Sequence, residues 1–313
     1  MIVVCGEALI DLVPRTCGDE PGFVPRTGGS PYNVAIGLGR LGVPTAFLGR
    51  VSRDRFGRVL REALVRDGVD VRWLGEGTEL STLAVVHLTE DAEPEFAFYG
   101  EGAADVMLHV DDLPAAFPDE VTALDFGSIS LLREPGASTF EALMRREHGR
   151  RFLCLDPNVR PGLIPDRAAY VRRLEGWVAL MDLVKVSRVD LGWLYPDRSI
   201  AEVATAWRAL GPELVVVTRG GEGGVAFGAG QPVAVPAPAV TVSDTVGAGD
   251  AFTSGLLAWL HDHDALSRTA LRALTPDRLA AAVEQGNRVA GITCERAGAQ
   301  PPTRAELTGA AGS

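Results

Sequence analysis

The sequence is poor in lysine, in cysteine and in long apolar runs. Its 30 basic residues are 29 arginines and one lysine, Lys185, a ratio that we attribute to genome composition. The four cysteines show no metal-ligand spacing, which argues against a cysteine-based zinc site. Cys5 and Cys154 lie inside apolar strand-like runs, so we expect buried free thiols, a reducing compartment and hence a cytoplasmic protein.

Two further absences narrow the class of protein. No uninterrupted apolar run approaches the ~20 residues of a membrane-spanning helix, and no G-x-x-x-x-G-K-[ST] stretch occurs, which excludes a P-loop nucleotide site. The net charge of −11 argues against a surface for nucleic acid or anionic membranes. With 46% hydrophobic residues, the 313-residue chain can bury a large core, and we expect a single domain over residues 1–313.

A glycine-rich stretch, DTVGAGDAF at residues 244–252, carries the strongest functional signal. It opens a helical pattern, so its glycines fall where a loop becomes a helix. Gly247 and Gly249 leave backbone N–H groups uncovered, and these groups, with the helix dipole, can surround a phosphate. Asp250 on the first turn is placed to accept a proton from an attacking hydroxyl, which indicates phosphoryl transfer. The alternative is an aspartate that only caps an ordinary helix.

Apolar strand-like runs and helical patterns alternate along much of the chain, which predicts a mostly parallel sheet with helices on both faces. Two β-rich runs, 81–89 and 95–99, are separated by a polar turn at 90–94 and predict a projecting hairpin. We expect residues 303–313 to fray. The main expected strands are 2–5, 45–49, 124–127, 152–155, 183–186 and 214–218, and the expected helices include 136–148, 167–180 and 199–210.

Polar side chains follow several strands, at the edge of the sheet where open α/β folds bind ligands. Asp11 follows the first strand, although by itself it is an ordinary loop acid. Arg160 follows the strand at 152–155 and would bring a permanent cation to a sugar or phosphoryl group, unless it pairs structurally with Asp156. Ser30 and Pro31 predict an N-cap and first turn of a helix.

Residues 37–42 spell G-x-G-x-x-G, the dinucleotide fingerprint. That motif needs a place between a strand and a helix, whereas here it lies inside a helical pattern. We interpret Gly37 and Gly39 as positions of close helix packing, so an NAD-dependent oxidoreductase is disfavoured.

The stretch at 244–252 resembles the C-terminal signature of the ribokinase/PfkB family of carbohydrate kinases. Gly28, Gly29 and Asn33, with Ala35 and the pair at 41–42, resemble its N-terminal signature. The resemblance implies a ribokinase-like, doubly wound α/β fold with a small β-lid, built from segments about 12–32 and 79–105. It also implies ATP-dependent phosphorylation of a small sugar, with Mg²⁺ and a monovalent cation such as K⁺ as cofactors.

The resemblance assigns roles to individual residues. Many members carry N-x-x-E where this chain has Ser187 and Asp190, which leaves open whether these two residues organise Mg²⁺. The implied catalytic residues are Asp250, Gly247, Ala248 and Gly249. The implied sugar contacts are Asp11, Gly28, Gly29, Asn33, Tyr99, Asn158 and Arg160. The implied nucleotide contacts are Lys185, Ser187, Thr218, Gly220, Gly223 and Asn287, and the implied metal positions are Asp190, Asp244 and Val246.

The substrate is predicted from two motifs and one departure. GGSPYNVA at 28–35 and D-P-N-x-R at 156–160 are similar to bacterial fructokinases and to 2-keto-3-deoxygluconate kinases. The second group recognises a carboxylate with a Tyr-Arg pair, but Gly100 follows Tyr99 here, so we expect a neutral sugar, D-fructose. The alternatives are 2-keto-3-deoxygluconate, another sugar of the family, or a catalytically silent sugar-binding regulator. Free lid edges also predict closure over the sugar or a homodimer through the lid.

Overall fold

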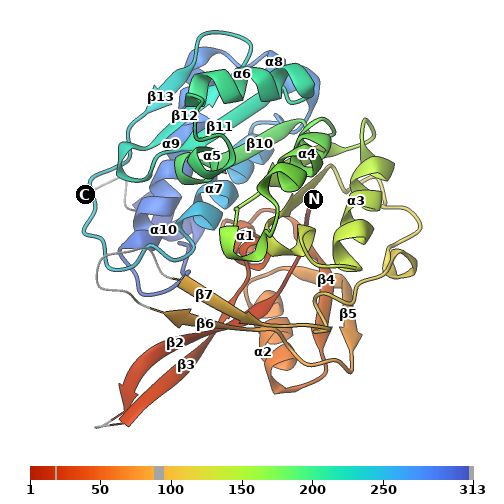
Figure 1. Ribbon diagram of the computed structural model, residues 1–313. Coiled ribbons are helices and arrows are strands. Elements are labelled where there is room, and N and C mark those ends of the chain that lie inside the picture. The colour runs from red at the N-terminus through yellow and green to blue at the C-terminus, as the bar shows by residue number, and fades with distance from the viewer. Residues whose placement is uncertain (18–19, 88–94, 310–313) are drawn as a thin grey trace.

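The computed structural model describes residues 1–17, 20–87 and 95–309, and within them nine strands form one central sheet (Figure 1). The order is β13-β12-β11-β10-β9-β8-β1-β4-β5, parallel from β11 to β5, with β12 and β13 antiparallel at one edge. The strands are β1 (Ile2–Cys5), β4 (Thr45–Ser52), β5 (Asp70–Gly77), β8 (Ala123–Gly127), β9 (Phe152–Asp156), β10 (Leu183–Ser187), β11 (Leu214–Thr218), β12 (Gly224–Phe227) and β13 (Val233–Val235).

Helices cover both faces of this sheet, which confirms the predicted α/β class (Figure 1). The strands β1, β8 and β9 are mostly apolar and are buried along their whole length, as strands covered on both faces are. One face packs on α1 (Ser30–Arg40), α2 (Arg55–Arg66), α7 (Ala248–Asp262) and α9 (Pro276–Cys294), with the short helices α8 (Arg268–Arg272) and α10 (Arg304–Gly309). The other face packs on α3 (Gly136–Glu147), α4 (Arg167–Val178), α5 (Arg188–Leu194) and α6 (Ile200–Leu210).

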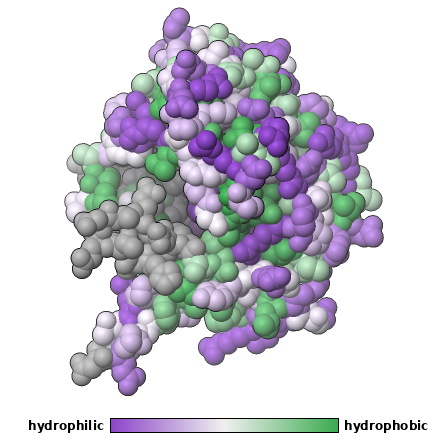
Figure 2. Space-filling model, viewed as in Figure 1, coloured by the Kyte–Doolittle hydropathy of each residue, from purple (hydrophilic) through white to green (hydrophobic). Residues whose placement is uncertain are grey.

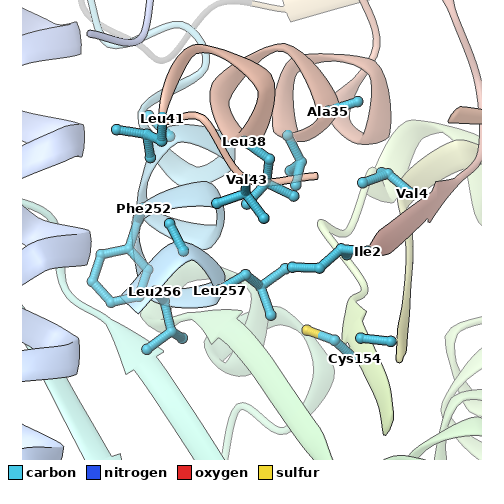
Figure 3. Close-up of a cluster of buried hydrophobic side chains, with 14 of the residues drawn as sticks. Ile2, Val4, Ala35, Leu38, Leu41, Val43, Cys154, Phe252, Leu256 and Leu257 are labelled. Atoms are coloured by element: carbon cyan, nitrogen blue, oxygen red, sulfur yellow. The ribbon is translucent and has the colours of Figure 1, made fainter. Parts of the chain in front are cut away.

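Helices α1 and α7 meet over the apolar cluster shown in Figure 3. Leu38 of α1 and Leu257 of α7 are both fully buried there, against Ile2 of β1. Gly37 lies where α1 crosses α7, and a Cβ at this position would collide with the Ser254 side chain. The G-x-G-x-x-G stretch is therefore a helix-packing feature, as expected from its place in the helical pattern.

A second, four-stranded sheet projects from the body at the lower left of Figure 1 and forms the predicted lid. Its order is β3-β2-β6-β7, with β2 (Leu9–Cys17), β3 (Glu20–Gly28), β6 (Leu83–His87) and β7 (Glu95–Tyr99). The lid begins earlier than expected, at Leu9, and residues 30–32 belong to α1. Asp11 is consequently inside strand β2 and not in a loop. Residues 88–94, which include the predicted turn, lie outside the described residues.

One local expectation was wrong, and one short helix was missed. The chain does not fray from residue 303, because residues 304–309 form α10, with Leu307 buried and Arg304 paired with Asp262. The seven-residue helix α5 was not predicted, since it is shorter than the periodicity can identify. Residues 310–313 lie outside the described residues.

Polar side chains dominate the face of the body shown in Figure 2, with apolar residues scattered among them. No helix in the described parts of the chain is long and apolar enough to cross a membrane.

Candidate active site

A cleft of about 700 Å³ opens at the carboxyl ends of the parallel strands, between the lid and the body. This volume is in the range of small-molecule sites. Residues predicted from both signatures and from the strand ends converge there, although they are far apart in the sequence. The predicted residues that line the cleft are Asp11, Gly29, Asn33, Asn158, Arg160, Lys185, Ser187, Asp190, Thr218, Gly220, Val246, Gly247, Gly249 and Asp250.

Asp250 lies on the first turn of α7 and is held by side-chain donors from two other segments. Its Oδ1 accepts from the Ser30 hydroxyl at 2.7 Å and from Asn158 Nδ2 at 3.5 Å, and its Oδ2 accepts from Asn33 Nδ2 at 2.8 Å. Burial raises the pKa of the Asp250 carboxyl, while the bonds from Asn33 and Ser30 oppose that rise. The result is a fixed, buried acceptor at the cleft wall.

The helix start beside Asp250 is shaped to receive an anion. Gly247 is the N-cap residue and adopts φ 76, a left-handed conformation that glycine permits. The Ala248 N–H is used in a turn, since it donates to the Thr245 carbonyl at 3.2 Å. The N–H groups of Gly249 and Asp250 come next in the first turn, where a helix provides no acceptor of its own.

The Ser30 side chain makes a contact in the cleft that sequence reasoning missed. It was expected to be the N-cap of α1, but Gly29 holds that position and has no side chain with which to cap the helix. The Ser30 hydroxyl is thereby free to reach Asp250. The Ser-Pro pair carries no signal for this contact, because a bond between residues 220 positions apart depends on the packing of α1 against α7.

Asp11 and Arg160, two of the expected sugar contacts, both line the cleft. Burial and the nearby Asp250 carboxyl raise the pKa of Asp11 to about 7, and Arg160 opposes this shift. A side chain on Gly28 would collide with the Asp11 carboxylate, so Gly28 makes room for Asp11 without lining the cleft. Arg160 Nη1 donates to Asn158 Oδ1 at 2.6 Å, and Asp156 forms its ion pair with Lys185. The alternative in which Arg160 pairs with Asp156 is therefore not observed.

Phe98, and not Tyr99, faces the cleft from the lid. Successive residues of a strand point to opposite sides, and Phe98 packs with Leu9, Ala84 and Ile129. The Tyr99 side chain is 67% exposed and is not part of the described cleft wall. The sequence shows that Phe98 and Tyr99 point to opposite sides of the strand, but only the orientation of the lid decides which of them faces the cleft.

Glu7 is a second residue that the sequence did not single out. Its two carboxylate oxygens accept from the backbone N–H groups of Ser30 at 3.2 Å and Ser130 at 3.1 Å. Burial raises its pKa to about 7. Glu7 thus joins the start of α1 to the loop after β8 at the floor of the cleft.

The cleft wall also contains Thr218, Gly220, Ser187 and Asp190. Ser187 caps α5, because its Oγ accepts from the Asp190 N–H at 2.9 Å. Burial and the neighbouring Asp156 raise the pKa of Asp190 to about 6. Among the described residues no group of three or more His, Cys, Asp or Glu side chains could hold a metal ion alone. A single carboxylate such as Asp190 could serve a hydrated Mg²⁺, whose other ligands would be water and phosphate oxygens.

Three predicted nucleotide or metal positions make internal contacts in place of lining the cleft. Asn287 Nδ2 donates to the carbonyls of Val235 and Pro236, both at 3.2 Å. Gly223 packs so closely on Val235 that no side chain would fit. Asp244 accepts from the N–H groups of Val246 at 3.0 Å and Gly298 at 2.8 Å, which ties the loop before α7 to the segment after α9.

Comparisons with known proteins agree with this geometry. The model of the pfkB family of carbohydrate kinases matches residues 1–306. A fructokinase from Rhizobium leguminosarum bv. trifolii is 42% identical over 280 residues, which cover 89% of this chain and 85% of the relative.

Two solved structures are similar over nearly the whole chain. A fructokinase from Xylella fastidiosa with bound ATP has a TM-score of 0.88 at 27% identity, covering 100% of this chain and 99% of its own. A fructokinase from Vibrio cholerae O395 bound to fructose, ADP and calcium has a TM-score of 0.85 at 29% identity, covering 98% and 97%. With the family model matched over residues 1–306 and a relative at 42% identity, this chain belongs to the pfkB family of carbohydrate kinases.

Proposed function

We propose that this protein transfers the γ-phosphoryl group of ATP to D-fructose, at the primary hydroxyl on C6. The observation that carries the proposal is the place of Asp250. It lies in the cleft wall together with Asp11 and Arg160, which are the expected sugar contacts, and with Gly249 at the start of α7. A hydroxyl and a phosphoryl group bound on the two sides of Asp250 would be neighbours.

The chemistry requires one proton acceptor and fixed donors for charge. The C6 oxygen forms a bond to the γ-phosphorus, the bond from that phosphorus to the β,γ-bridging oxygen breaks, and ADP leaves. Asp250 takes the hydroxyl proton, and Ser30 and Asn33 keep its carboxylate oriented for that step. The backbone N–H of Gly249 stabilises negative charge on the phosphoryl oxygens.

Two further groups fit the residues present. Asp190, supported by Ser187, would hold a hydrated Mg²⁺ that neutralises charge on the phosphates. The loop joined by Asp244, Val246 and Gly298 would hold the monovalent cation. We also infer that the protein acts in a reducing compartment, the cytoplasm, which the buried free thiols of Cys5 and Cys154 support.

Fructose as the acceptor is supported by the names of the relatives and by Gly100. An arginine at position 100 would require its neighbours to shift, because a Cβ there would lie 2.4 Å from Thr82 Oγ1 and 2.6 Å from Arg133 Nη1. Without that guanidinium a carboxylate substrate would lose roughly 1.5–3 kcal/mol of charge-assisted bonding.

Arg133 favours the second candidate, 2-keto-3-deoxygluconate. Its guanidinium lies over the ring of Phe98, 5.4 Å from the centroid, and Phe98 lines the cleft. In the described part of the chain the Arg133 Nη1 atom is buried without a hydrogen-bond partner. A carboxylate on the acceptor would be a suitable partner for it.

The test is a side-by-side panel of sugars, with ADP release measured in magnesium buffer with and without K⁺. We expect kcat/KM for D-fructose at least tenfold above that for 2-keto-3-deoxygluconate, and a product phosphorylated at C6 by NMR. The reverse ranking would assign the Arg133 side of the cleft to a carboxylate. Sugar binding without ADP release for any sugar would instead identify a silent regulator.

A further inference from the structure

A buried carboxylate at the floor of the cleft has no cation beside it. Glu7 is 1% exposed, and no ion pair in the described part of the chain includes it. Burial raises the pKa of Glu7 to about 7, and the nearby Asp105 carboxylate adds to this rise. A buried charge without a counter-ion is costly. The two hydrogen bonds that Glu7 accepts account for its presence.

These two bonds hold segments that are far apart in the sequence. Oε1 of Glu7 accepts from the Ser30 N–H at 3.2 Å, at the start of α1. Oε2 accepts from the Ser130 N–H at 3.1 Å, in the loop after β8. A carboxylate offers two acceptor oxygens, whereas a glutamine offers one oxygen and an NH₂ donor. Among side chains of this length, only a carboxylate satisfies both N–H groups at once.

Helix α1 depends on this contact because it has no cap of its own. Gly29 is the N-cap residue, has no side chain and adopts φ 108. The first N–H groups of a helix lack partners inside the helix, and Glu7 supplies one from 23 residues away. A Cβ on Gly29 would lie 2.7 Å from the Glu7 carbonyl oxygen, and a Cβ on Gly6 would collide with the Pro31 ring. The start of α1 is thus seated closely on residues 6 and 7.

The residue that Glu7 holds is also a donor to the proposed base. Ser30 presents its N–H to Glu7 and its hydroxyl to Asp250 Oδ1, at 2.7 Å. A hydroxyl hydrogen bond is short and directional, so a small shift of the Ser30 backbone would weaken it. The contact between Ser30 and Asp250 therefore depends on where Glu7 holds the start of α1.

The second bond of Glu7 joins this arrangement to the seat of the lid. Ile129 is the neighbour of Ser130 and lines the cleft. It packs against one residue from each of the lid strands β2, β6 and β7, which are Leu9, Ala84 and Phe98. One carboxylate thus links the helix start that presents Ser30 to the loop on which the lid rests.

We propose that Glu7 is a positioning residue of the transfer reaction, which keeps the Ser30 hydroxyl aimed at Asp250 by holding the start of α1 against the loop after β8. This inference rests on the proposed function and adds a residue that acts only through Ser30. Asp250 still takes the hydroxyl proton, and Glu7 neither gains nor loses one. The competing explanation is that Glu7 joins the two segments for stability alone.

The direction of a pKa change separates these explanations. In Glu7→Gln one of the two N–H groups faces an NH₂ donor, so the link breaks and Ser30 can shift. The bond from Ser30 lowers the pKa of Asp250, so its loss should raise that pKa. Loss of a nearby negative charge alone would lower it. The variant leaves in place the charged groups that face Asp250, which are Asp11, Asp125, Asp156 and Lys185.

The experiment titrates the side-chain carboxyl groups of isotope-labelled aspartate by NMR, with Asp250→Asn used to assign the signal. We expect Ser30→Ala, Glu7→Gln and the double variant to raise the pKa of Asp250 by similar amounts, because both changes break the same bond. An unchanged or lowered pKa in Ser30→Ala or in Glu7→Gln would overturn the proposal. If Glu7→Gln does not fold, Glu7→Asp replaces it. Its carboxylate is one methylene too short to reach both N–H groups, so the same rise is expected and its absence overturns the proposal.

The matched control is Glu147→Gln. Glu147 is also buried and accepts from two groups outside the cleft, on Arg146 and Arg151. The control should lower Tm and leave the pKa of Asp250 and kcat unchanged. A rise of that pKa in the control as large as in Glu7→Gln would show a general effect of lost stability and refute the positioning role.

Steady-state kinetics test the same route through turnover. We expect kcat to fall about tenfold in Ser30→Ala and in Glu7→Gln, within the range that misplacing a catalytic group by up to about 1 Å costs. The double variant should be slower than either single variant by no more than about twofold, since effects that pass through one bond are not additive. A loss of about 100-fold in the double variant, the product of two independent effects, would refute the route through Ser30.

The titration needs no substrate, so it separates this inference from the proposed function. If D-fructose is not phosphorylated but the pKa of Asp250 rises as expected in Ser30→Ala and Glu7→Gln, the acceptor assignment fails and the positioning role of Glu7 stands. If D-fructose is phosphorylated and the pKa rises in Ser30→Ala only, the proposed function stands and the role of Glu7 is refuted.

Discussion

Replacing Asp250 with Asn separates its catalytic role from its structural one, because the two roles predict opposite results. The Asn side chain has nearly the same shape and keeps the contacts. Its carbonyl oxygen can still accept from the Ser30 hydroxyl, and the amide of Asn33 can rotate to accept from the new NH₂ group. The variant loses only the negative charge and the ability to take a proton.

The expected cost in catalysis is 10²–10⁴ in kcat, the usual contribution of a general base. At ~1.4 kcal/mol per factor of ten this is about 3–5 kcal/mol of transition-state stabilisation. Affinity for ATP should stay within a few-fold, because the Gly247–Gly249 backbone is unchanged. Rapid-quench measurement of ADP formation under saturating sugar and ATP gives the chemical step directly.

The stability of the folded protein should increase in Asp250→Asn at neutral pH, although its activity falls. Burial raises the pKa of Asp250 above its unfolded value of ~3.9. The protonated form is therefore favoured in the folded state, and stability from this group is present below the unfolded pKa and lost as pH rises through the folded pKa. Asn carries no such penalty. The Tm of Asp250→Asn minus that of wild type should grow from pH 4 upward and then level off.

The matched control is Asp277→Asn, an exposed aspartate on the first turn of α9. It should leave kcat unchanged and show no such growth of the Tm difference with pH. Near wild-type turnover in Asp250→Asn would refute the assignment of the base. A large loss of Tm with the loss of activity would mean that Asp250 is mainly a structural acceptor.

Three further changes test other parts of the site. Gly249→Val should lower kcat more than 10²-fold, because the branched side chain fills the space beside Lys185 Nζ. The control Gly176→Val, in open space on α4, should leave kcat unchanged. A loss of folding in Gly249→Val as large as its loss of activity would mean that Gly249 is only structural. The lid's free edge strand β3 exposes Phe23, whose side chain is 54% accessible. We therefore expect light scattering to report a dimer, and we expect Phe23→Asp to dissociate it. A strict wild-type monomer whose lid is equally mobile with and without sugar would count against both lid pairing and lid closure. Arg50 donates to Glu79 at 3.0 Å and to the carbonyl of residue 107 at 2.9 Å, and these two residues flank the second lid segment. Arg50→Met should therefore raise the sugar KM about tenfold with little change in kcat. An unchanged KM would show that Arg50 does not hold the lid in place for sugar binding.

The fold could be predicted from the sequence where the signal is local. Strands such as β1 and β9 are continuous apolar runs, and their burial on both faces follows from that pattern. The start of α7 was equally visible, because Gly247 and Gly249 mark the loop-to-helix transition next to Asp250. The short helix α5 escaped prediction because seven residues complete too few turns for a period to emerge.

Contacts between distant segments account for what the sequence could not reveal. Ser30 has the local signature of a helix cap, and that signature is satisfied whether or not its hydroxyl points at Asp250. Phe98 and Tyr99 are adjacent aromatics on one strand, so the choice of the inward residue depends on how the lid sheet sits over the body. Nothing within a few residues of either position carries that information.

The same reasoning explains why the capping and catalytic interpretations of Asp250 were inseparable in the sequence. A first-turn aspartate serves a helix by accepting backbone N–H groups of its own turn. Here its side-chain donors are instead Ser30, Asn33 and Asn158, which are 220, 217 and 92 residues away. An acceptor assembled from separate segments contributes nothing to the local turn, and its burial costs stability. The proposed role as proton acceptor would account for a carboxylate kept at that cost beside the start of α7.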